Sequence, residues 1–392
     1  MNIKLLDSET LSRARQLFPH TATGHIYFNH AATGPLSTRV VAAMNEHLSA
    51  RSSGAVDTYW TDVDVVKQCR ERAQKLINAE SPDRIALLPS TSETLNVVVA
   101  GLDWKSGDRV LMNAGEFPAN VYPYLSVKQL GVELDVIKNA DEAMTPELIE
   151  HSLTPRTRAV ALSAVQFLSG YKADLAAIGD LCRRKNILFL VDGIQSVGAM
   201  RIDVQAMKVD AFGAGAQKWL LGPHGAGFLY VTEELQERVR QKHLGWLSPE
   251  NPWNFFDYNQ PLAKAARRYE GGSLNFPGVW GMNAALGTLL EFGSKRIESH
   301  VLALTRLLMD KLGSLPEFSF YSPTDDTRRS GIVTIQPTGG ADTEKIFKSL
   351  LAQHITISLR HGKLRFSPHF YNSVEEVQMF IDRLTELRSV AV

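Results

Sequence analysis

One lysine stands in an apolar, glycine-rich stretch, FGAGAQKWLLGPHGAG, residues 212–227. Lys218 has Ala, Gly, Trp and Leu as close neighbours in sequence. Burial among such residues lowers the pKa of a lysine and makes its amine a nucleophile toward aldehydes. A P-loop would need GxxxxGK followed by Ser or Thr, whereas Trp219 follows here and no such glycine pattern precedes it. The stretch therefore favours a lysine that forms a Schiff base.

An aspartate closes the apolar run ILFLVDG, residues 187–193. A carboxylate at the end of a buried strand is costly to bury without a cationic partner. Asp192 could cap the next helix, serve a dinucleotide site, or hold the protonated ring nitrogen of a cofactor. No GxGxxG precedes it at the spacing of a dinucleotide site. The residues alone leave the cap and the cofactor contact open, with the cap ahead.

The segment PSTSETLN, residues 89–96, follows an apolar run and opens a helical pattern. Ser90 and Glu93 match a capping box. A phosphate at this helix start would meet free backbone N–H groups and the hydroxyls of Thr91 and Ser92. The motif therefore predicts a helix cap or a phosphate cradle, and the plain cap is favoured on the residues alone.

The elements that must position these side chains alternate between strand-like and helical patterns. Seven short runs are typical of strands: RIALLPS, DRVLMNAG, VELDVIK, RAVALSAV, ILFLVDG, DAFGAGA and AGFLYV. The alternation predicts an α/β fold in which helices flank a mostly parallel seven-stranded sheet. The carboxyl ends of such strands lie at one rim, where ligands usually bind.

The pattern changes after residue 278. A long helical stretch from 279 to about 315 is followed by the strand SGIVTIQP, the helix DTEKIFKSLLAQH, the hairpin-like ITISLRHGKLRFSP and the final helix SVEEVQMFIDRLTEL. This order predicts a smaller α+β domain. We expect a large α/β domain over residues 20–275 and a small domain over residues 276–392, completed by residues 1–19.

The composition argues against nucleic acid and membranes as partners. Lys and Arg total 42, and Asp and Glu total 42, so there is no basic excess to neutralise phosphates. No run approaches the roughly 18 apolar residues of a membrane span. The first 25 residues lack the apolar core of a secretory signal. Cys69 and Cys182 show no metal-ligand or CxxC spacing, so we expect a cytoplasmic protein.

Five motifs, taken in order, resemble those of a known family. STSETLN, VDGIQSVGA, GAGAQKWLLGPHGAGFLYV, YEGGSLN and GKLRFSPHFYNSVEEV occur in the order and with the spacing of class V aminotransferases. The likeness runs from YFNHAATGPLS to the end of the chain. The family includes cysteine desulfurases, isopenicillin-N epimerase-like proteins and kynureninases. The resemblance implies a fold-type I enzyme that uses pyridoxal 5′-phosphate.

The resemblance implies roles for five residues around the cofactor. Lys218 resembles the lysine that holds pyridoxal phosphate as an internal aldimine. Asp192 resembles the carboxylate that keeps the ring nitrogen protonated, which lets the ring withdraw electrons. Gln195 is similar to the residue that binds the phenolic oxygen. Thr91 and Ser92 resemble the phosphate cradle, which now outweighs the plain cap.

Other positions depart from the family or are matched more loosely. Phe117, in GEFPANVYPY, stands where desulfurases have a histidine stacked on the cofactor; it can stack but cannot carry a proton. Gln217 stands where many relatives have a phosphate-binding histidine, and Gln166 lies near a position that contacts the phenolic oxygen. Ser273 resembles a residue that reaches the phosphate of the neighbouring subunit, which implies a homodimer with shared active sites.

The resemblance also implies a site for an amino-acid substrate. Arg365, in KLRFSPHFYN, matches the arginine that grips the substrate α-carboxylate, a task suited to its planar fork. A solvated arginine on a strand is the alternative. NHAATG, residues 29–34, resembles the segment that lines the substrate pocket, with His30 and Ala31 as candidate contacts. No metal ligand is expected.

Several reactions fit this scaffold. Transamination is favoured because Lys218 alone can move the proton that it requires. β-Elimination by a C–S lyase or a desulfurase-like enzyme and epimerisation are the alternatives. A desulfurase that forms a persulfide needs a cysteine on a mobile loop before the substrate arginine, and RHGKLR, residues 360–365, has neither. A non-catalytic cofactor-binding regulator would have no use for a substrate-carboxylate clamp.

Overall fold

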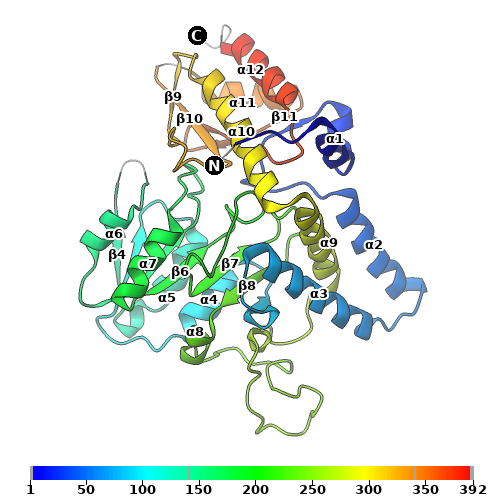
Figure 1. The fold of residues 1–392 in the computed structure, drawn as a ribbon, viewed down its shortest axis with the longest axis vertical. Helices are drawn as coiled ribbons and strands as arrows, with labels where there is room; N and C mark the ends of the chain where they lie inside the picture. Colours follow the sequence, from blue (N-terminus) through cyan, green and yellow to red (C-terminus); the bar gives the residue numbers. More distant parts are fainter. Residues whose placement is uncertain (1–2, 140–141, 340, 389–392) are drawn as a thin grey trace.

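The computed structural model describes residues 3–139, 142–339 and 341–388, and it is built around a seven-stranded sheet (Figure 1). In sheet order the strands are β2 (Ile85–Leu87), β8 (Gly227–Val231), β7 (Ala211–Gly215), β6 (Leu188–Asp192), β5 (Thr157–Ser163), β3 (Arg109–Asn113) and β4 (Glu133–Ile137). β8 pairs antiparallel with β2 and β7, and the other neighbours pair in parallel. Each of the seven predicted runs supplies one strand, so the predicted α/β fold is confirmed.

The direction of β8 follows from the connection that precedes it. Residues 216–226 join β7 to β8 without a helix. A parallel neighbour would require a crossover of a dozen or more residues, usually helical, whereas a short return suits an antiparallel strand. The connection that carries Lys218 is therefore a loop folded back at the carboxyl end of β7.

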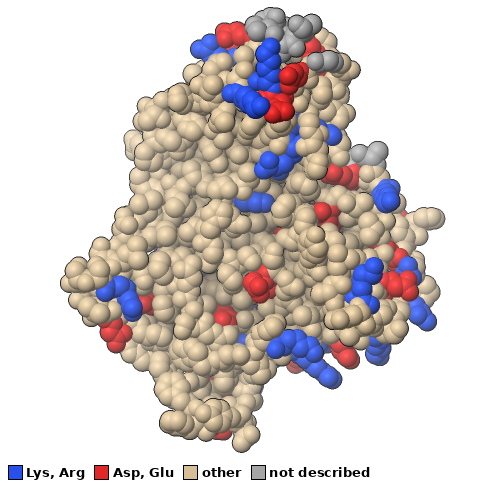
Figure 2. All heavy atoms as spheres, turned by 180° about the vertical axis from the view of Figure 1, so that it is seen from behind, with Lys and Arg blue, Asp and Glu red and all other residues tan. Residues whose placement is uncertain are grey.

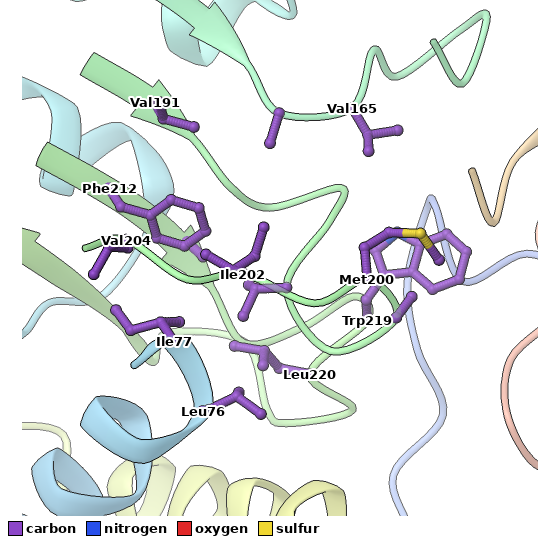
Figure 3. Packing of buried hydrophobic residues seen from close by; sticks show 14 of the residues in the cluster. Leu76, Ile77, Val165, Val191, Met200, Ile202, Val204, Phe212, Trp219 and Leu220 are labelled. Atoms are coloured by element: carbon purple, nitrogen blue, oxygen red, sulfur yellow. The ribbon is translucent and has the colours of Figure 1, made fainter. Parts of the chain in front are cut away.

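Helices cover both faces of the large sheet. Successive side chains of its buried strands point to opposite faces, so both faces are apolar and both are covered. Along β6, Leu188 and Leu190 belong to one apolar layer, while Phe189 and Val191 belong to the other. The first layer is closed by α4 (Thr91–Gly101), α5 (Tyr122–Ser126) and α8 (Glu233–Arg238); the second is closed by α3 (Tyr59–Ile77), α7 (Leu175–Lys185) and α9 (Phe276–Phe292). Figure 3 shows part of the second layer, in which Val191, Phe212 and Ile77 are labelled.

The predicted long helical stretch is two helices, α9 and α10 (Ser294–Leu312). They part at Gly293, whose φ of 83° is a conformation that glycine adopts without strain. α2 (Thr38–Ser53) and α3 precede the large sheet in the chain, and both pack against α9. The remaining helices of the large sheet and the N-terminus are α6 (Pro146–Ser152) and α1 (Ser8–Gln16).

A second, antiparallel sheet lies above the first in Figure 1. Its order is β12 (Ser358–Arg360), β13 (Lys363–Phe366), β10 (Val333–Pro337) and β9 (Phe318–Phe320), and it packs with α10, α11 (Thr343–Ala352) and α12 (Val374–Arg388). β12 and β13 form the predicted hairpin. β11 (Ile355–Thr356), expected in the same hairpin, instead pairs in parallel with β1 (Ile26–Tyr27). The domain limits at residues 20 and 275 stay a prediction.

Charged side chains do not form a single-sign field on the face in Figure 2. Basic and acidic residues lie interspersed there, with wide areas of uncharged residues between them. In the described part of the chain, none of the helices combines the length and the apolar character that a membrane span requires.

Candidate active site

The predicted chemistry-bearing side chains meet at the carboxyl rim of the large sheet. Asp192 is the last residue of β6, and Lys218 follows β7 after two residues. α4 starts at Thr91, the fourth residue after the end of β2, and the Thr91 Oγ1 accepts a hydrogen bond of 2.9 Å from the Gly215 N–H at the end of β7. Strand ends on one rim therefore bring together residues that lie more than a hundred positions apart in the chain.

Lys218 is held in an environment that disfavours its charged form. Burial lowers the pKa of its amine to about 8; Arg365 and Arg360 add to this effect, and Asp192 opposes it. The Nζ lies 5.4 Å from the centre of the Phe117 ring. The lowered pKa gives the amine a larger neutral, nucleophilic fraction than an ordinary lysine has; its role as a Schiff-base lysine stays a prediction.

Asp192 is a buried carboxylate with one unsatisfied oxygen. Its side chain is 2% exposed, and Oδ1 accepts a hydrogen bond of 2.9 Å from the Ile194 N–H. Within the described ranges, Oδ2 has no hydrogen-bond partner. Burial raises the pKa of Asp192 to about 7, with Glu116 adding to the shift and Lys218 opposing it. The free oxygen is therefore a strong acceptor that lacks a cationic donor.

Glu116 is a second buried carboxylate at this rim, and the sequence reading did not single it out. It is 7% exposed and accepts hydrogen bonds from the Ser163 N–H (2.9 Å), the Ser163 hydroxyl (2.5 Å), Asn120 (2.9 Å) and Gln166 (2.7 Å). The bond from Nε2 fixes the Gln166 amide, and among the described residues the buried Gln166 Oε1 has no partner. A charged residue just past an apolar strand, on the same rim as Asp192, was the signal that could have revealed Glu116.

Gln195 already has protein partners on both ends of its amide. Its Nε2 donates to the Ala31 carbonyl at 3.0 Å, and its Oε1 accepts from the Trp219 indole N–H at 2.9 Å. The residue next to Lys218 is thereby tied to the N-terminal segment that the sequence assigned to the substrate pocket. Contact of Gln195 with the cofactor and of Ala31 with the substrate stays a prediction.

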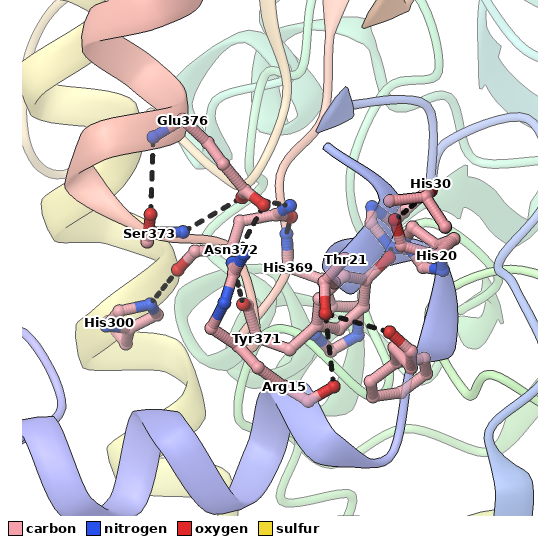
Figure 4. Close-up of polar contacts among 12 residues, drawn as sticks. Arg15, His20, Thr21, His30, His300, His369, Tyr371, Asn372, Ser373 and Glu376 are labelled. Atoms are coloured by element: carbon pink, nitrogen blue, oxygen red, sulfur yellow. Dashed lines mark hydrogen bonds and ion pairs between the residues drawn. The ribbon is translucent and has the colours of Figure 1, made fainter. Parts of the chain in front are cut away.

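His30 belongs to a buried polar network that joins both ends of the chain (Figure 4). Its Nδ1 lies 2.7 Å from the Ser367 carbonyl oxygen and its Nε2 lies 2.8 Å from the Tyr371 hydroxyl. His369 similarly lies 2.9 Å from the Trp219 carbonyl oxygen. Burial lowers the pKa of His30 well below its ordinary value, so the ring is neutral. With both nitrogens engaged, its geometry is that of a structural histidine, and the predicted substrate contact has no support here.

Arg365 reaches the rim from β13 and is 2% exposed. It donates to the Phe167 carbonyl at 2.5 Å and to the Ser358 hydroxyl at 3.3 Å, and in the described part of the chain its buried Nε has no partner. Burial and the charge of Arg360 lower the pKa of Arg365 to about 9. Its burial excludes the alternative of a solvated strand arginine. Phe167 also packs edge-on against Phe117 at 5.3 Å, which connects Arg365 to Lys218.

The remaining predicted residues lie at more open positions. Phe117 is 41% exposed, Gln217 is half-buried beside Lys218, and Ser92 is exposed in the first turn of α4. Ser273 is exposed before α9 and lines a different cavity, of about 310 Å³, with Pro89 and Asn275. The structure therefore groups Phe117 and Gln217 with Lys218, and it leaves Ser273 at the surface.

Gly34 controls how closely the N-terminal segment approaches the lysine. Its N–H donates to the Gln217 carbonyl at 2.8 Å, and a Cβ at this position would lie 2.2 Å from the Lys218 carbonyl oxygen. We expect Gly34→Ala to displace the Lys218 backbone and to reduce the free energy of unfolding by about 1–3 kcal/mol. Denaturant unfolding measures this loss. The control is Gly339→Ala, where an added Cβ meets no atom within 4 Å; equal stability losses would contradict the close-approach argument.

Comparisons with known proteins agree with the fold and the motifs. The family model for class-V aminotransferases matches residues 26–380. A probable cysteine desulfurase of Methanothermobacter thermautotrophicus is 29% identical over 388 residues, which cover 93% of this chain and 94% of that protein. The apo structure of the cysteine desulfurase from Thermococcus onnurineus NA1 has a TM-score of 0.88 at 25% identity and covers 99% of this chain and 100% of its own.

A solved structure also shows a cofactor on this fold. A mutant of C-DES with glycine covalently linked to pyridoxal phosphate has a TM-score of 0.87 at 22% identity, covering 95% of this chain and 99% of that one. The predicted resemblance to the class V family is confirmed. The predicted cofactor is also confirmed, because this family depends on pyridoxal phosphate. Because the family model spans residues 26–380 of 392, the chain belongs to the class-V aminotransferases.

Proposed function

We propose that this enzyme cleaves the C–S bond of a sulfur-containing amino acid by β-elimination and releases the sulfur into solution. From the sequence alone, transamination is the favoured reaction. The relatives named cysteine desulfurase instead favour chemistry at a C–S bond, which was the alternative. With L-cysteine and water as reactants, the balanced products are pyruvate, ammonia and hydrogen sulfide.

The observation that carries this proposal is the burial of both thiols. Cys69 in α3 is 0% exposed and Cys182 in α7 is 1% exposed. Burial raises the pKa of each thiol to about 12, so neither is available as a thiolate to accept sulfur. A sulfur atom removed from the substrate therefore has no acceptor thiol on this chain and must leave with the product.

The β12–β13 hairpin supports the same conclusion. Arg360 pairs with Lys363, so the connection is the two-residue turn His361-Gly362. Both turn residues have positive φ, 49° and 71°, as in the tight type I′ turns of hairpins. No mobile loop precedes Arg365 in this hairpin, which leaves no place for a sulfur-carrying cysteine.

The residues at the rim fit pyridoxal phosphate. The unpaired Asp192 Oδ2 is a suitable acceptor for a protonated ring nitrogen, and the start of α4 with Thr91 and Ser92 provides N–H and hydroxyl donors for a phosphate. Lys218 has the lowered pKa that condensation with an aldehyde requires. When bound, this cofactor supplies an electron-withdrawing ring that stabilises negative charge at the substrate Cα.

Three side chains would carry out the remaining steps of binding and proton transfer. Arg365 would hold the substrate α-carboxylate, for which its Nε is free within the described residues. The Lys218 amine would take the proton from Cα, because its charged form is disfavoured by burial. Phe117 would cover one ring face without exchanging protons, so proton transfer would be confined to the lysine side. Such one-sided transfer favours elimination over epimerisation.

The reaction is tested by a product balance. Purified holoenzyme is incubated with L-cysteine, L-cystine and L-alanine. We expect pyruvate, ammonia and hydrogen sulfide from L-cysteine, pyruvate, ammonia and cysteine persulfide from L-cystine, and no reaction with alanine. A sulfur-free amino acid product with a persulfide on the protein would show desulfuration instead. Pyridoxamine phosphate and an oxo acid that keeps its side chain would show transamination. Either outcome overturns the proposal.

Replacing both cysteines provides an independent check. In the double variant Cys69→Ala, Cys182→Ala we expect pyruvate formation near the native rate, because both thiols are buried in α3 and α7. Loss of each buried sulfur should cost only about 1 kcal/mol of stability. Steady-state assays and thermal unfolding measure the two effects. Loss of product formation by a variant that is still folded would identify a catalytic thiol and contradict the proposal.

Substitution of Arg365 should affect substrate binding. We expect Arg365→Lys to raise KM by about tenfold or more, because an ammonium cannot reproduce bidentate binding of a carboxylate. The effect on kcat should be smaller, since this contact is made before and during the reaction. Arg360→Lys, at an exposed neighbouring position, is the control. Equal changes in both variants would indicate a general charge effect.

We infer that the active enzyme is a homodimer with shared sites. The segment around residues 246–258 exposes large aromatic side chains: Trp246, Trp253, Phe255, Phe256 and Tyr258. Exposed apolar groups in such number are typical of surfaces that contact another chain. Ser273, which the family resemblance assigns to the neighbouring phosphate, is likewise exposed. Both features support a second copy of the chain as the partner.

A further inference from the structure

A second cavity lies outside the Lys218 site. It has a volume of about 550 Å³ and is lined by the start of α6, residues 164–165 and 171–176, side chains of the segment 196–207, Glu298 of α10, and residues 327–328. This volume is within the range of small-ligand pockets. Val165 and Met200, both labelled in Figure 3, contribute to its apolar wall.

A buried carboxylate on α10 faces this cavity without a complete set of partners. Glu298 is 4% exposed and lines the cavity, and in the described ranges its Oε2 has no hydrogen-bond partner. Burial raises the pKa of Glu298, and the Arg201 N–H and the charge of Lys172 oppose the rise. A buried acceptor with no donor is costly unless a ligand or a solvent molecule supplies one.

The other acidic side chains of the cavity already interact with groups of the protein. Asp174 accepts from the Ala177 N–H at 3.1 Å and caps α7. Asp203 accepts from the Ala206 N–H at 2.9 Å and from Asn78 at 3.0 Å. Glu147 lies exposed in the first turn of α6, where the helix start and Arg328 lower its pKa. Among these acidic side chains, Glu298 is therefore the one that could accept a hydrogen bond from a cationic group of a ligand.

Basic side chains are available on the same walls. Lys172 is half-buried and Arg201 is exposed at the cavity edge, and their charges act on Glu298. In the described part of the chain, neither side chain lies within 4 Å of a carboxylate. The cavity thus offers one buried negative group, two unpaired positive groups and an apolar surface.

We propose that this cavity binds a free α-amino acid with an apolar side chain, separately from the catalytic site. The ammonium group would bind to Glu298, the carboxylate to Lys172 and Arg201, and the side chain would pack against Val165 and Met200. The cavity wall is continuous with the site, since residues 164–165 precede Gln166 and Ser196 follows Gln195. The proposal does not depend on which reaction the enzyme catalyses.

Equilibrium dialysis of the holoenzyme with labelled L-leucine and L-methionine tests the proposal. We expect a bound fraction that survives Arg365→Gln, which disables the substrate clamp, and that weakens by about tenfold or more in Glu298→Gln and in Lys172→Met. Lys185→Met, on the exposed face of α7, is the matched control and should bind as the native enzyme does. Thermal unfolding shows that each variant is folded.

Two simpler probes test whether the site requires both the ammonium group and the carboxylate of an amino acid. Succinate lacks the ammonium group and isoamylamine lacks the carboxylate, so both should bind more weakly than leucine. Binding that disappears completely in Arg365→Gln would place the amino acid in the catalytic site and overturn the proposal. Binding unchanged in Glu298→Gln, equal binding of succinate, or no binding of either amino acid up to about 10 mM would also overturn it.

Discussion

Lys218→Ala is expected to abolish turnover and the visible absorption of lysine-bound cofactor while leaving the fold intact. The side chain supplies both the covalent attachment and the base, so we expect a loss of about 10³-fold or more. The fold should persist because the loop is held by backbone contacts, including those from Gly34 to Gln217 and from Leu221 to Lys218. Removal of a desolvated amine also relieves a burial cost.

Absorption spectra, borohydride trapping and thermal unfolding measure these effects together. The exposed Lys242→Ala variant is the control and should retain the native spectrum, rate and stability. A borohydride adduct in Lys218→Ala, or one on another lysine of the native protein, would contradict the assignment. Unfolding of the variant would contradict the claim that backbone contacts hold the loop.

Asp192→Asn should separate stability from activity. We expect turnover to fall by on the order of 10²- to 10³-fold, because a neutral amide cannot stabilise a protonated ring nitrogen. The cofactor-free variant should be as stable as the native protein or more stable, because a buried carboxylate with an unpaired oxygen is replaced by an amide of the same shape. The amide oxygen can still accept the Ile194 N–H.

The stability difference should depend on pH with a definite sign. Burial raises the pKa of Asp192 from 3.8 to about 7 in the folded protein. The folded state therefore binds more protons than the unfolded state between these values, and its stability falls as the pH rises through this range. The advantage of Asp192→Asn should be absent below pH 3.8 and complete above about 7. Denaturant unfolding of both cofactor-free proteins across this range measures it; a constant difference would show that Asp192 has an ordinary pKa.

The seven strands of the large sheet were predictable because each is a short apolar run bounded by turn residues. ILFLVDG became β6, and its aspartate fell at the rim as the pattern required. The two-residue pairing of β1 with β11 was not predictable, since it joins segments over 300 residues apart and carries no periodic signal. Helices α2 and α3 pack against α9, and the sequence alone does not reveal that these three helices are neighbours.

The candidate site was predictable in its residue types more than in its hydrogen bonds. The Lys218 motif alone favoured a Schiff-base lysine, whereas the roles of Asp192 and Arg365 were predicted from the family resemblance. Gln195 and His30 look equally available in the sequence, but the folded chain engages their polar atoms with Ala31, Trp219, Ser367 and Tyr371. Tertiary packing decides which polar groups become hydrogen-bond partners of each other. Glu116 was missed for the same reason, because two of its partners, Ser163 and Gln166, come from β5 and the loop after it.

The pairing of β1 with β11 has a consequence for biosynthesis. Residues 26–34 leave the ribosome early, yet their hydrogen-bond partners at residues 354, 356, 367 and 371 are made almost last. A nascent chain can form the large sheet and still lack the wall that holds the Trp219 loop. Competence to retain the vitamin-derived group should therefore arise only at the end of translation, and chains released before Tyr371 should remain incomplete at that wall.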